Sequence, residues 1–323
     1  MPTPPSSSLP PAPSPTATCT LTLLPAGRIH LQSSHFVSDP IPSDPPTLHC
    51  PSMSWLLHHP ATNTRLLFDL GLRKDSQNYI PPIAERIRTR VSIDVVEDVY
   101  DGLKKAGLDA QKDIDVVIFS HLHYDHVGDP GGFGAGTKFV IGPGAAGLLG
   151  DGPRTWPGDE GSIFDSGLLA GRAEGRVVEL PAPAPEDPEE EEKKKEAFWK
   201  PLGPFPYAHD YFGDGSVFII NAPGHLLGHI NLLVRVGLEK WMYLAGDTAH
   251  DVRVYRGTRE LAVYPDPKSG RMVCAHGDRE AAHEHMLRVR RFEEDEGGRV
   301  EVVLAHDYEW AERFGGLWGV VGG

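Results

Sequence analysis

The sequence lacks several features that would mark a secreted or membrane-bound protein. Its 323 residues include three cysteines, Cys19, Cys50 and Cys274, and so small and scattered a set excludes a disulfide framework and fits a reducing compartment. No apolar run approaches the roughly 20 residues that span a bilayer. The opening MPTPPSSSLPPAPSPTAT has neither the basic nor the apolar segment of a signal peptide. We therefore expect a soluble, cytoplasmic protein without a membrane partner.

Basic residues are also in short supply. The chain has 31 Lys and Arg against 45 Asp and Glu, a formal net charge of -14 at pH 7. A field of this sign repels phosphate backbones, so nucleic acid is not an expected partner or substrate. Hydrophobic residues, at 40%, suffice for a packed core, and the length suits one large α/β domain or two ordinary ones. The sequence does not indicate an oligomeric state.

Composition divides the chain into a tail and one domain. Residues 1–17 are rich in Pro and Ser and are expected to be disordered. Residues 18–323 form a single domain, interrupted by a charged insertion near 181–200. Aromatic residues crowd the segment 198–212, which is either core or a lid over a substrate, with the lid slightly favoured. The Pro-rich segment 40–51 is expected to be a long loop.

Short apolar runs bounded by polar residues predict buried strands. These runs cover 115–120, 139–140, 177–180, 217–221, 230–236, 241–245 and 300–304. Apolar spacings of three and four predict a helix from Asp94 to Leu108, with Asp94 as its cap, and another over 280–292. Strand clusters in both halves, each followed by a helix, suggest two packed sheets with helices outside.

The strongest motif, HLHYDH, occupies residues 121–126 directly after the apolar run 115–120. Alternate residues of an extended turn point the same way, so two of its histidines can hold one ion while the Asp-His pair faces a second. Imidazole and carboxylate are ligands that Zn²⁺ accepts. The motif therefore predicts a metal site whose ligands are His121, His123, Asp125 and His126.

Three more candidate ligands each follow a predicted strand. His225 lies in APGH, Asp247 in GDT and His306 in LAHD. Ligands at the ends of neighbouring strands converge on one rim and are held by a rigid scaffold. A site for two ions therefore has enough ligands.

In this order, HLHYDH, APGH, GD and AH resemble the motifs of the metallo-β-lactamase superfamily, over about residues 18–310. The resemblance implies an α/β fold of the αββα sandwich type, with two ions at one edge, zinc first and Mn²⁺ or Fe²⁺ as alternatives. It also implies that Asp69, in FDLG, orients a ligand histidine. The implied ligands are His121, His123 and His225 for one ion, Asp125, His126 and His306 for the other, and Asp247 for both.

Two adjacent dications supply the chemistry of a hydrolase. Held about 3.5–4 Å apart, they share a water, lower its pKa and direct it at a carbonyl carbon, so that no serine or cysteine nucleophile is needed. Asp125 or Asp247 could shuttle the proton. The segments SHLHYDH and PGHLLGH resemble those of quorum-quenching N-acyl-homoserine lactonases, which often carry a tyrosine where this chain has His250. Tyr124 could replace that phenol, so the predicted catalytic residues are Asp125, Asp247, His250 and Tyr124.

The expected substrate is a small molecule with a cyclic ester, ahead of a cyclic amide or carbamate such as benzoxazolinone. The lactamase alternative resembles a fungal group, and a thioesterase of the glyoxalase II kind is a third possibility. Outside the hydrolases, a two-iron oxidoreductase would need an electron-carrying partner domain, and none is visible. A non-catalytic metal or ligand carrier is the remaining alternative, against which the complete ligand set argues.

The other histidines are interpreted as structural. His229 is expected to pack beside the site without binding metal. Cys274 and His276 have no evident partner ligands. His283 and His285 lie on the predicted helix 280–292 and are expected to be solvated.

Overall fold

The computed structural model describes residues 9–12, 14, 17–150, 153–169, 175–183, 198–266, 269–316 and 319–321. Most of the expected tail, residues 1–17, and most of the charged insertion near 181–200 lie outside the described residues. Over the described residues, no helix is both long enough and apolar enough to cross a membrane.

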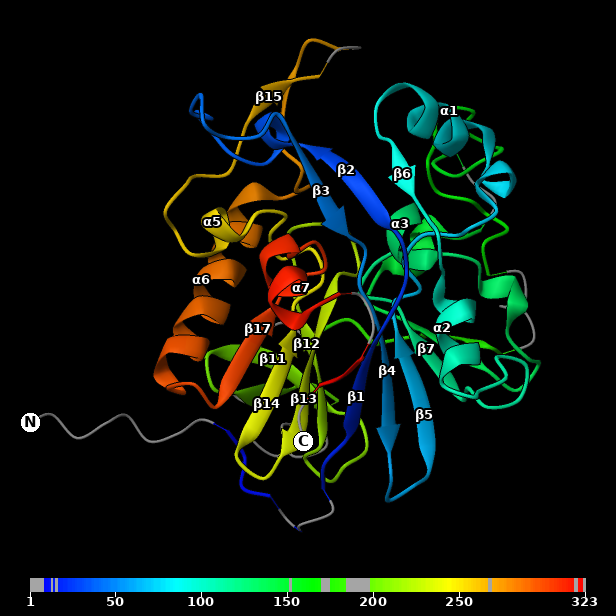
Figure 1. Ribbon diagram of the computed structural model, residues 1–323, viewed down its shortest axis with the longest axis vertical. Coiled ribbons are helices and arrows are strands. Elements are labelled where there is room, and N and C mark those ends of the chain that lie inside the picture. The colour runs from blue at the N-terminus through cyan, green and yellow to red at the C-terminus, as the bar shows by residue number, and fades with distance from the viewer. Residues whose placement is uncertain are drawn as a thin grey trace, which may run out of the picture.

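Two large β-sheets face each other at the centre of the molecule (Figure 1). The first is 7-stranded, in the order β18-β1-β4-β5-β7-β8-β9. Its strands are β1 (Thr20–Leu24), β4 (Ser54–His59), β5 (Thr64–Phe68), β7 (Val116–Ile118), β8 (Lys138–Ile141), β9 (Val177–Glu179) and β18 (Gly319–Val321). The second is 6-stranded and consists of β10 (Lys200–Leu202), β11 (Phe205–Asp210), β12 (Val217–Asn221), β13 (Ile230–Gly237), β14 (Lys240–Leu244) and β17 (Val300–Val303), in that order.

Helices and two small sheets surround this pair. The small sheets are β3-β2-β6, made of β2 (Arg28–Gln32), β3 (Thr47–Pro51) and β6 (Ile93–Asp94), and β15 (Tyr264–Pro265) with β16 (Met272–Val273). The α-helices are α1 (Pro81–Thr89), α2 (Val99–Lys105), α3 (Tyr124–Val127), α5 (Val252–Tyr255), α6 (Arg279–Asp295) and α7 (Tyr308–Phe314). The 3₁₀ turns are η1 (Ser33–His35), η2 (Ser76–Asn78), η3 (Pro130–Gly132) and η4 (Ala145–Leu148).

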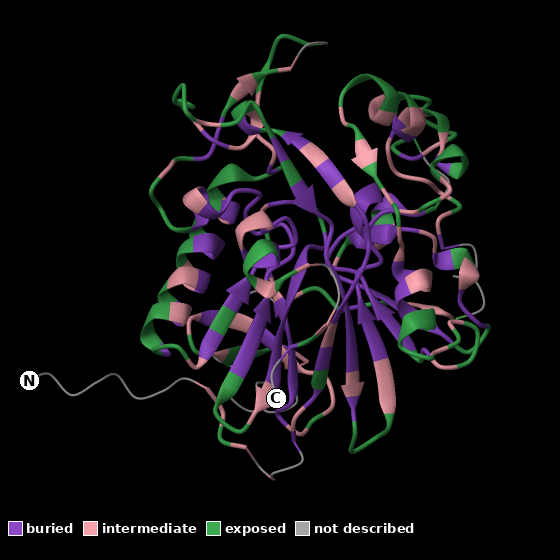
Figure 2. Ribbon diagram, in the orientation of Figure 1, coloured by how far each residue is buried: buried purple, intermediate pink, exposed green. Residues whose placement is uncertain are grey.

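Strands made of consecutive apolar residues are buried on both faces of their sheet. In β12, Val217 and Ile219 belong to the core between the two sheets, whereas Phe218 and Ile220 belong to the core under α6. Because successive side chains of a strand point to opposite faces, this division explains why the run has no polar alternation. Figure 2 shows the buried strands at the centre and exposed residues on the outer helices.

The expected α/β sandwich is confirmed, with α2 packed outside the first sheet and α6 outside the second. The predicted strands are all present, and 217–221 coincides with β12. The first sheet also has parallel neighbours, β5-β7-β8-β9, so several of its strands end at one edge.

The predicted helix from Asp94 to Leu108 is corrected at its start. Asp94 instead ends β6, where it pairs with Arg28. The helix α2 begins at Val99, because the carboxylate of Asp98 accepts hydrogen bonds from two backbone N–H groups of the first turn in a complete capping box.

The expected loop 40–51 and the expected lid are also corrected. The last residues of the loop form β3, which pairs antiparallel with β2. In the segment 198–212, Trp199 is 8% exposed and, with Phe198 and Tyr207, packs on the core between the sheets, while β11 pairs with β12. This aromatic segment therefore completes the second sheet and is not a lid.

Candidate metal centre

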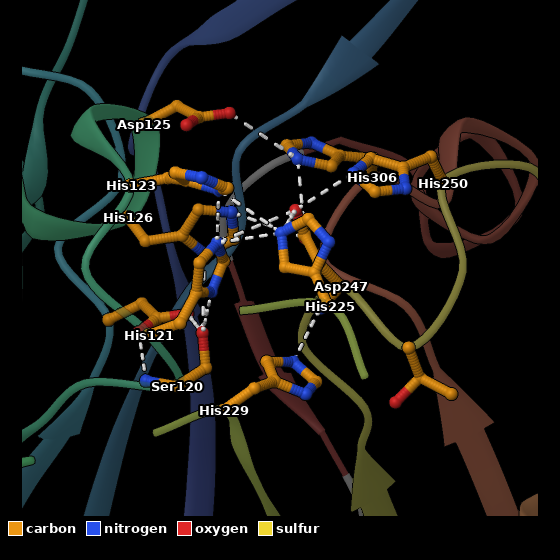
Figure 3. Close-up of polar contacts among 12 residues, drawn as sticks. Ser120, His121, His123, Asp125, His126, His225, His229, Asp247, His250 and His306 are labelled. Carbon is orange, nitrogen blue, oxygen red and sulfur yellow. Dashed lines mark hydrogen bonds and ion pairs between the residues drawn. The ribbon is translucent and has the colours of Figure 1, made fainter. Parts of the chain in front are cut away.

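The seven predicted ligands come from four chain segments, and their side chains point toward one another (Figure 3). The motif 121–126 follows β7 of the first sheet and continues into α3. His225, Asp247 and His306 follow β12, β14 and β17 of the second sheet. Both sheets therefore contribute to the cluster, and its ligand atoms converge as the sequence predicted.

One group of side chains consists of three histidines around a single point. The Nε2 atom of His121 lies 2.9 Å from Nδ1 of His123 and 3.2 Å from Nε2 of His225. Nε2 of His225 is 3.1 Å from Nδ1 of His123. With one carboxylate oxygen of Asp247, these atoms form a compact group of potential metal ligands.

A second group consists of Asp125, His126 and His306. Nε2 of His306 lies 3.5 Å from Oδ2 of Asp125. Asp247 faces both groups: its Oδ1 is 3.2 Å from Nε2 of His126, whereas its Oδ2 is 3.3 Å from Nε2 of His225. The two oxygens of one carboxylate are thus divided between the two groups.

The tautomers of the second group leave lone pairs facing carboxylates. Nδ1 of His306 lies 2.7 Å from the carbonyl oxygen of Pro51 and must donate to it, so in the neutral ring Nε2 carries a lone pair. That lone pair faces oxygens of Asp125 and Asp247. Among the described residues, Nε2 of His126 and Oδ1 of Asp247 have no hydrogen-bond partner although both are buried. Electron pairs that face one another in this way fit a shared cation, so these residues are suited to hold metal.

Burial and neighbouring charges shift the pKa values of these side chains. Burial lowers the pKa of His121 and of His225 well below the usual value, and that of His123 to about 4, so these rings are neutral and free to bind metal. Burial also opposes the charge on His126, but the carboxylates of Asp247 and Asp69 outweigh it and raise its pKa. Burial likewise opposes ionisation of Asp247, yet the histidines around it hold its pKa well below the usual range.

An outer layer of hydrogen bonds orients these candidate ligands. The Asp69 carboxylate accepts from the Ser120 backbone N–H at 2.6 Å and lies 2.9 Å from Nδ1 of His126, as the resemblance implied. His229 accepts the backbone N–H of Asp247 at Nε2, 3.1 Å away, and its Nδ1 lies 2.8 Å from the carbonyl oxygen of Ala222. His229 therefore packs beside the cluster and supports the loop that carries Asp247.

His250 lies against the cluster, whereas Tyr124 points into a neighbouring core. Nε2 of His250 is 3.1 Å from Oδ2 of Asp247, and the ring of Phe36 stacks on it at 4.5 Å. The Tyr124 ring packs edge-on against Tyr79 and its hydroxyl contacts Arg86. No sequence signal pointed to Phe36, which is far from His250 along the chain.

Two other histidines differ from their expected environments. His285 is 2% exposed, and its Nε2 lies 2.8 Å from Oδ1 of Asn231, so the expectation that it is solvated is wrong; His283 is exposed, as expected. The reason is that the helix turns His285 toward the second sheet together with Met286. His276 is buried beside His225 and His250, two neighbours that no sequence motif indicated.

The family model described as the metallo-beta-lactamase superfamily matches residues 49–273, which include most of these ligands. The chain belongs to the metallo-β-lactamase superfamily. Members of this superfamily bind divalent metal ions, and the histidine–aspartate groups of this chain have the corresponding composition. The resemblance stated from the motifs is therefore confirmed.

Two curated relatives from fungi are similar over most of the chain. A metallo-hydrolase of Annulohypoxylon moriforme is 33% identical over 242 residues, 72% of this chain and 57% of its own length. A γ-lactamase of Fusarium pseudograminearum is 31% identical over 256 residues, 76% of this chain and 57% of its own length. The chain thus spans little more than half the length of these relatives, whose names agree with the prediction of a hydrolase.

Solved structures of the superfamily share the fold. An N-acyl homoserine lactone hydrolase, solved with the product N-hexanoyl-L-homoserine at its catalytic metal centre, superimposes with a TM-score of 0.60. The two chains are 18% identical, and the match covers 91% of this chain and 95% of the other. At this identity the similarity concerns the architecture.

Proposed function

We propose that the chain is a metal-dependent hydrolase that opens a small cyclic amide or ester at a site for two divalent cations, zinc in the first place. The observation that carries the proposal is the division of the Asp247 carboxylate between two groups of histidine and aspartate ligands. A carboxylate so placed is suited to bridge two ions. When bound, such ions would supply an ionised water and polarise the carbonyl of the substrate.

The protein residues have separate tasks in this proposal. The ligands of the first ion are His121, His123 and His225, those of the second are Asp125, His126 and His306, and Asp247 is shared. Asp125 and Asp247 hold or pass on the proton that the leaving atom requires. We assign the contact with the substrate carbonyl to His250: its Nε2–H, 3.1 Å from Oδ2 of Asp247, would be shared between that oxygen and the carbonyl oxygen.

Tyr124 has a smaller part in the proposal than the motif alone suggested. Its hydroxyl contacts Arg86 and its ring packs with Tyr79, so it shapes the wall beside the motif. We assign the substrate contact to His250 in its place.

The γ-lactam ranks ahead of the lactone as substrate class. The Fusarium relative that is 31% identical over 76% of this chain is named a γ-lactamase, whereas the lactone hydrolase is 18% identical and supports the fold. The PGHLLGH segment keeps the lactone as the second candidate. Both reactions are an attack on a carbonyl carbon with loss of a ring nitrogen or oxygen, and the same residues serve either one.

The proposal is tested on zinc-loaded protein with a panel of γ-lactams, lactones and thioesters. We expect turnover of a γ-lactam or lactone, its loss with a chelator and recovery with zinc, and its loss in His123→Ala. The exposed His283→Ala serves as the matched control and should retain full activity. Protein that binds two zinc ions yet hydrolyses nothing in the panel would revive the carrier alternative, and redox-active iron in native protein would favour the oxidoreductase.

A further inference from the structure

A third group of buried histidines adjoins the first ligand group and shares His225 with it. It consists of His225, His250 and His276, which can each contribute one ring nitrogen to a set within 4.8 Å of one another. The ring of His276 lies 5.2 Å from that of His225 and 5.3 Å from that of His250, between centroids. Within the described part of the chain, Nδ1 of His225, Nδ1 of His250 and both nitrogens of His276 have no hydrogen-bond partner.

The backbone fixes His276 beside His225. The N–H of Gly277 donates to the carbonyl oxygen of His225 at 3.0 Å, and that of Asp278 donates to Gly224 at 2.8 Å. Gly224 lies so close to the first turn of α6 that a Cβ at this position would be 2.2 Å from the backbone nitrogen of Ala282. The loop before α6 and the loop that carries His225 are therefore held together, which keeps the backbones of His276 and His225 close to each other.

The neighbours of each ring determine which nitrogen carries hydrogen. Nε2 of His225 faces His121, His123 and Asp247, so as a metal ligand it needs its lone pair there, and its Nδ1 must be the N–H donor. Nε2 of His250 lies 3.1 Å from a carboxylate oxygen of Asp247. That nitrogen donates to the oxygen, which leaves Nδ1 of His250 as an acceptor.

His276 can satisfy both requirements at once. A neutral imidazole offers one N–H and one lone pair, and His276 is 3% exposed, with neither ring nitrogen hydrogen-bonded to a described residue. One nitrogen can accept from His225 while the other donates to His250. One nitrogen of each ring lies within 4.8 Å of the others, a separation that one bridging water molecule can span.

We infer that His276 joins His225 to His250 in a hydrogen-bonded chain that ends at Asp247 and fixes the tautomers of a metal ligand and of the histidine facing the substrate. The inference rests on the ligand role of His225 in the proposed function. His276 is then a positioning residue, since it acts through its two neighbours. A metal-bound histidine usually donates its other N–H to such an outer partner, and loss of that partner weakens metal binding by about 10–100-fold.

A third cation in this group is the competing interpretation. It would need lone pairs on both nitrogens of His225, since Nε2 already faces the first ligand group. The ring would have to lose both protons, and a third positive charge would lie beside two others. The contact between His250 and Asp247 favours the hydrogen-bonded chain.

The test compares His276→Phe, which fills the space without polar atoms, with His276→Asn, which keeps one donor and one acceptor. The exposed His283→Phe is the control for a ring exchange in the neighbouring turns. Zinc stoichiometry and affinity are measured on the full chain against a competing chelator. The tautomers of His225 and His250 are read from ring nitrogen shifts of ¹⁵N-labelled, zinc-loaded protein.

We expect two zinc ions in the wild type, with Nδ1 of His225 and Nε2 of His250 protonated. His276→Phe should weaken the affinity for one zinc ion by about 10–100-fold and give a mixture of His250 tautomers. His276→Asn should restore most of the zinc affinity and most of the single tautomer. His283→Phe should change neither the zinc affinity nor the tautomers. Three zinc ions in the wild type and two in His276→Phe would show a cation site and overturn the inference. If His276→Phe held two zinc ions tightly with unchanged tautomers, this inference would be wrong and the proposed function would stand. If the wild-type protein bound no zinc, both the inference and the proposed function would be wrong.

Discussion

At the scale of single residues, the candidate ligands that could be predicted from sequence are those that lie in a short motif next to a predicted strand. The motif 121–126 follows a strand directly, so its spacing predicted the cluster. Phe36, which stacks on His250, and His276, which lies beside it, come from loops whose approach depends on the tertiary fold. The carbonyl oxygen of Pro51 that orients His306 leaves no mark in the sequence, because every residue has one.

Asp69→Asn should weaken zinc binding while preserving the fold. The carboxylate of Asp69 serves both Nδ1 of His126 and the N–H of Ser120, and an amide offers one acceptor oxygen in place of two. Asp69 has φ of 60°, a left-handed conformation that asparagine tolerates, so backbone strain is unchanged. We expect affinity to fall by about 10–100-fold in a competition titration with a chelator. Unchanged affinity would show that His126 needs no carboxylate partner.

His250→Phe should impair turnover without loss of metal. The new ring keeps the stacking with Phe36 but removes the N–H that faces Oδ2 of Asp247. Loss of one hydrogen-bond donor to a reacting carbonyl lowers kcat by about 100-fold or more. Metal analysis and steady-state kinetics check the two parts separately. A simultaneous loss of metal would make His250 a ligand or a support and contradict its role toward the substrate.

At the scale of elements, strands buried on both faces were predictable and irregular connections were not. Runs such as 217–221 have no polar position, which restricts them to the interior of a layered fold. The small sheet of β2 and β3 was missed because the segment before Thr47 is rich in proline and suggested a loop. Those prolines lie before the residues of β3 that pair with β2. The start of α2 depended on which of two aspartates caps it, and spacing alone did not decide between Asp94 and Asp98.

Asp98→Ala should destabilise the protein more than Asp94→Ala. The Asp98 side chain accepts from the backbone N–H groups of Tyr100 and Asp101, and loss of such a cap costs about 1 kcal/mol of unfolding free energy. Asp94 is exposed at the end of β6, where a substitution usually costs less than about 0.5 kcal/mol. Urea unfolding of both variants measures the difference. Equal losses would mean that the capping box contributes nothing.

Gly224→Ala should displace the loop that carries His225. Gly224 has φ of 125°, and an added Cβ would lie 2.2 Å from the backbone of Ala282 in α6. Gly107→Ala is the matched control, since Gly107 has φ of 74° but nothing within 4 Å of the added Cβ. Gly107→Ala should lose about 1–2 kcal/mol of unfolding free energy, because alanine is strained in the left-handed conformation. Gly224→Ala should lose more unfolding free energy than Gly107→Ala and should also bind zinc more weakly. Equal effects of the two substitutions would contradict the close approach of Gly224 to α6.

At the scale of the whole molecule, removal of metal should lower the melting temperature. Ligands from both sheets surround the same ions in our proposal, so binding favours the folded state alone. At an ion concentration 100 times the dissociation constant this linkage contributes about 2.7 kcal/mol, or roughly 4 °C for a domain of about 300 residues. Thermal unfolding with and without a chelator measures it. His123→Ala should show a smaller shift, and an equal shift would indicate metal bound elsewhere.

The division of the ligands between β7 and the strands of the second sheet has a practical consequence. In the proposed site, early and late parts of the chain must both be in place before any ion is held with full affinity. A fragment that keeps HLHYDH but ends before Asp247 would therefore retain the motif and lose the site. The moles of tightly held ion per mole of chain would therefore measure the natively assembled fraction of any preparation, independently of whether a substrate has been found.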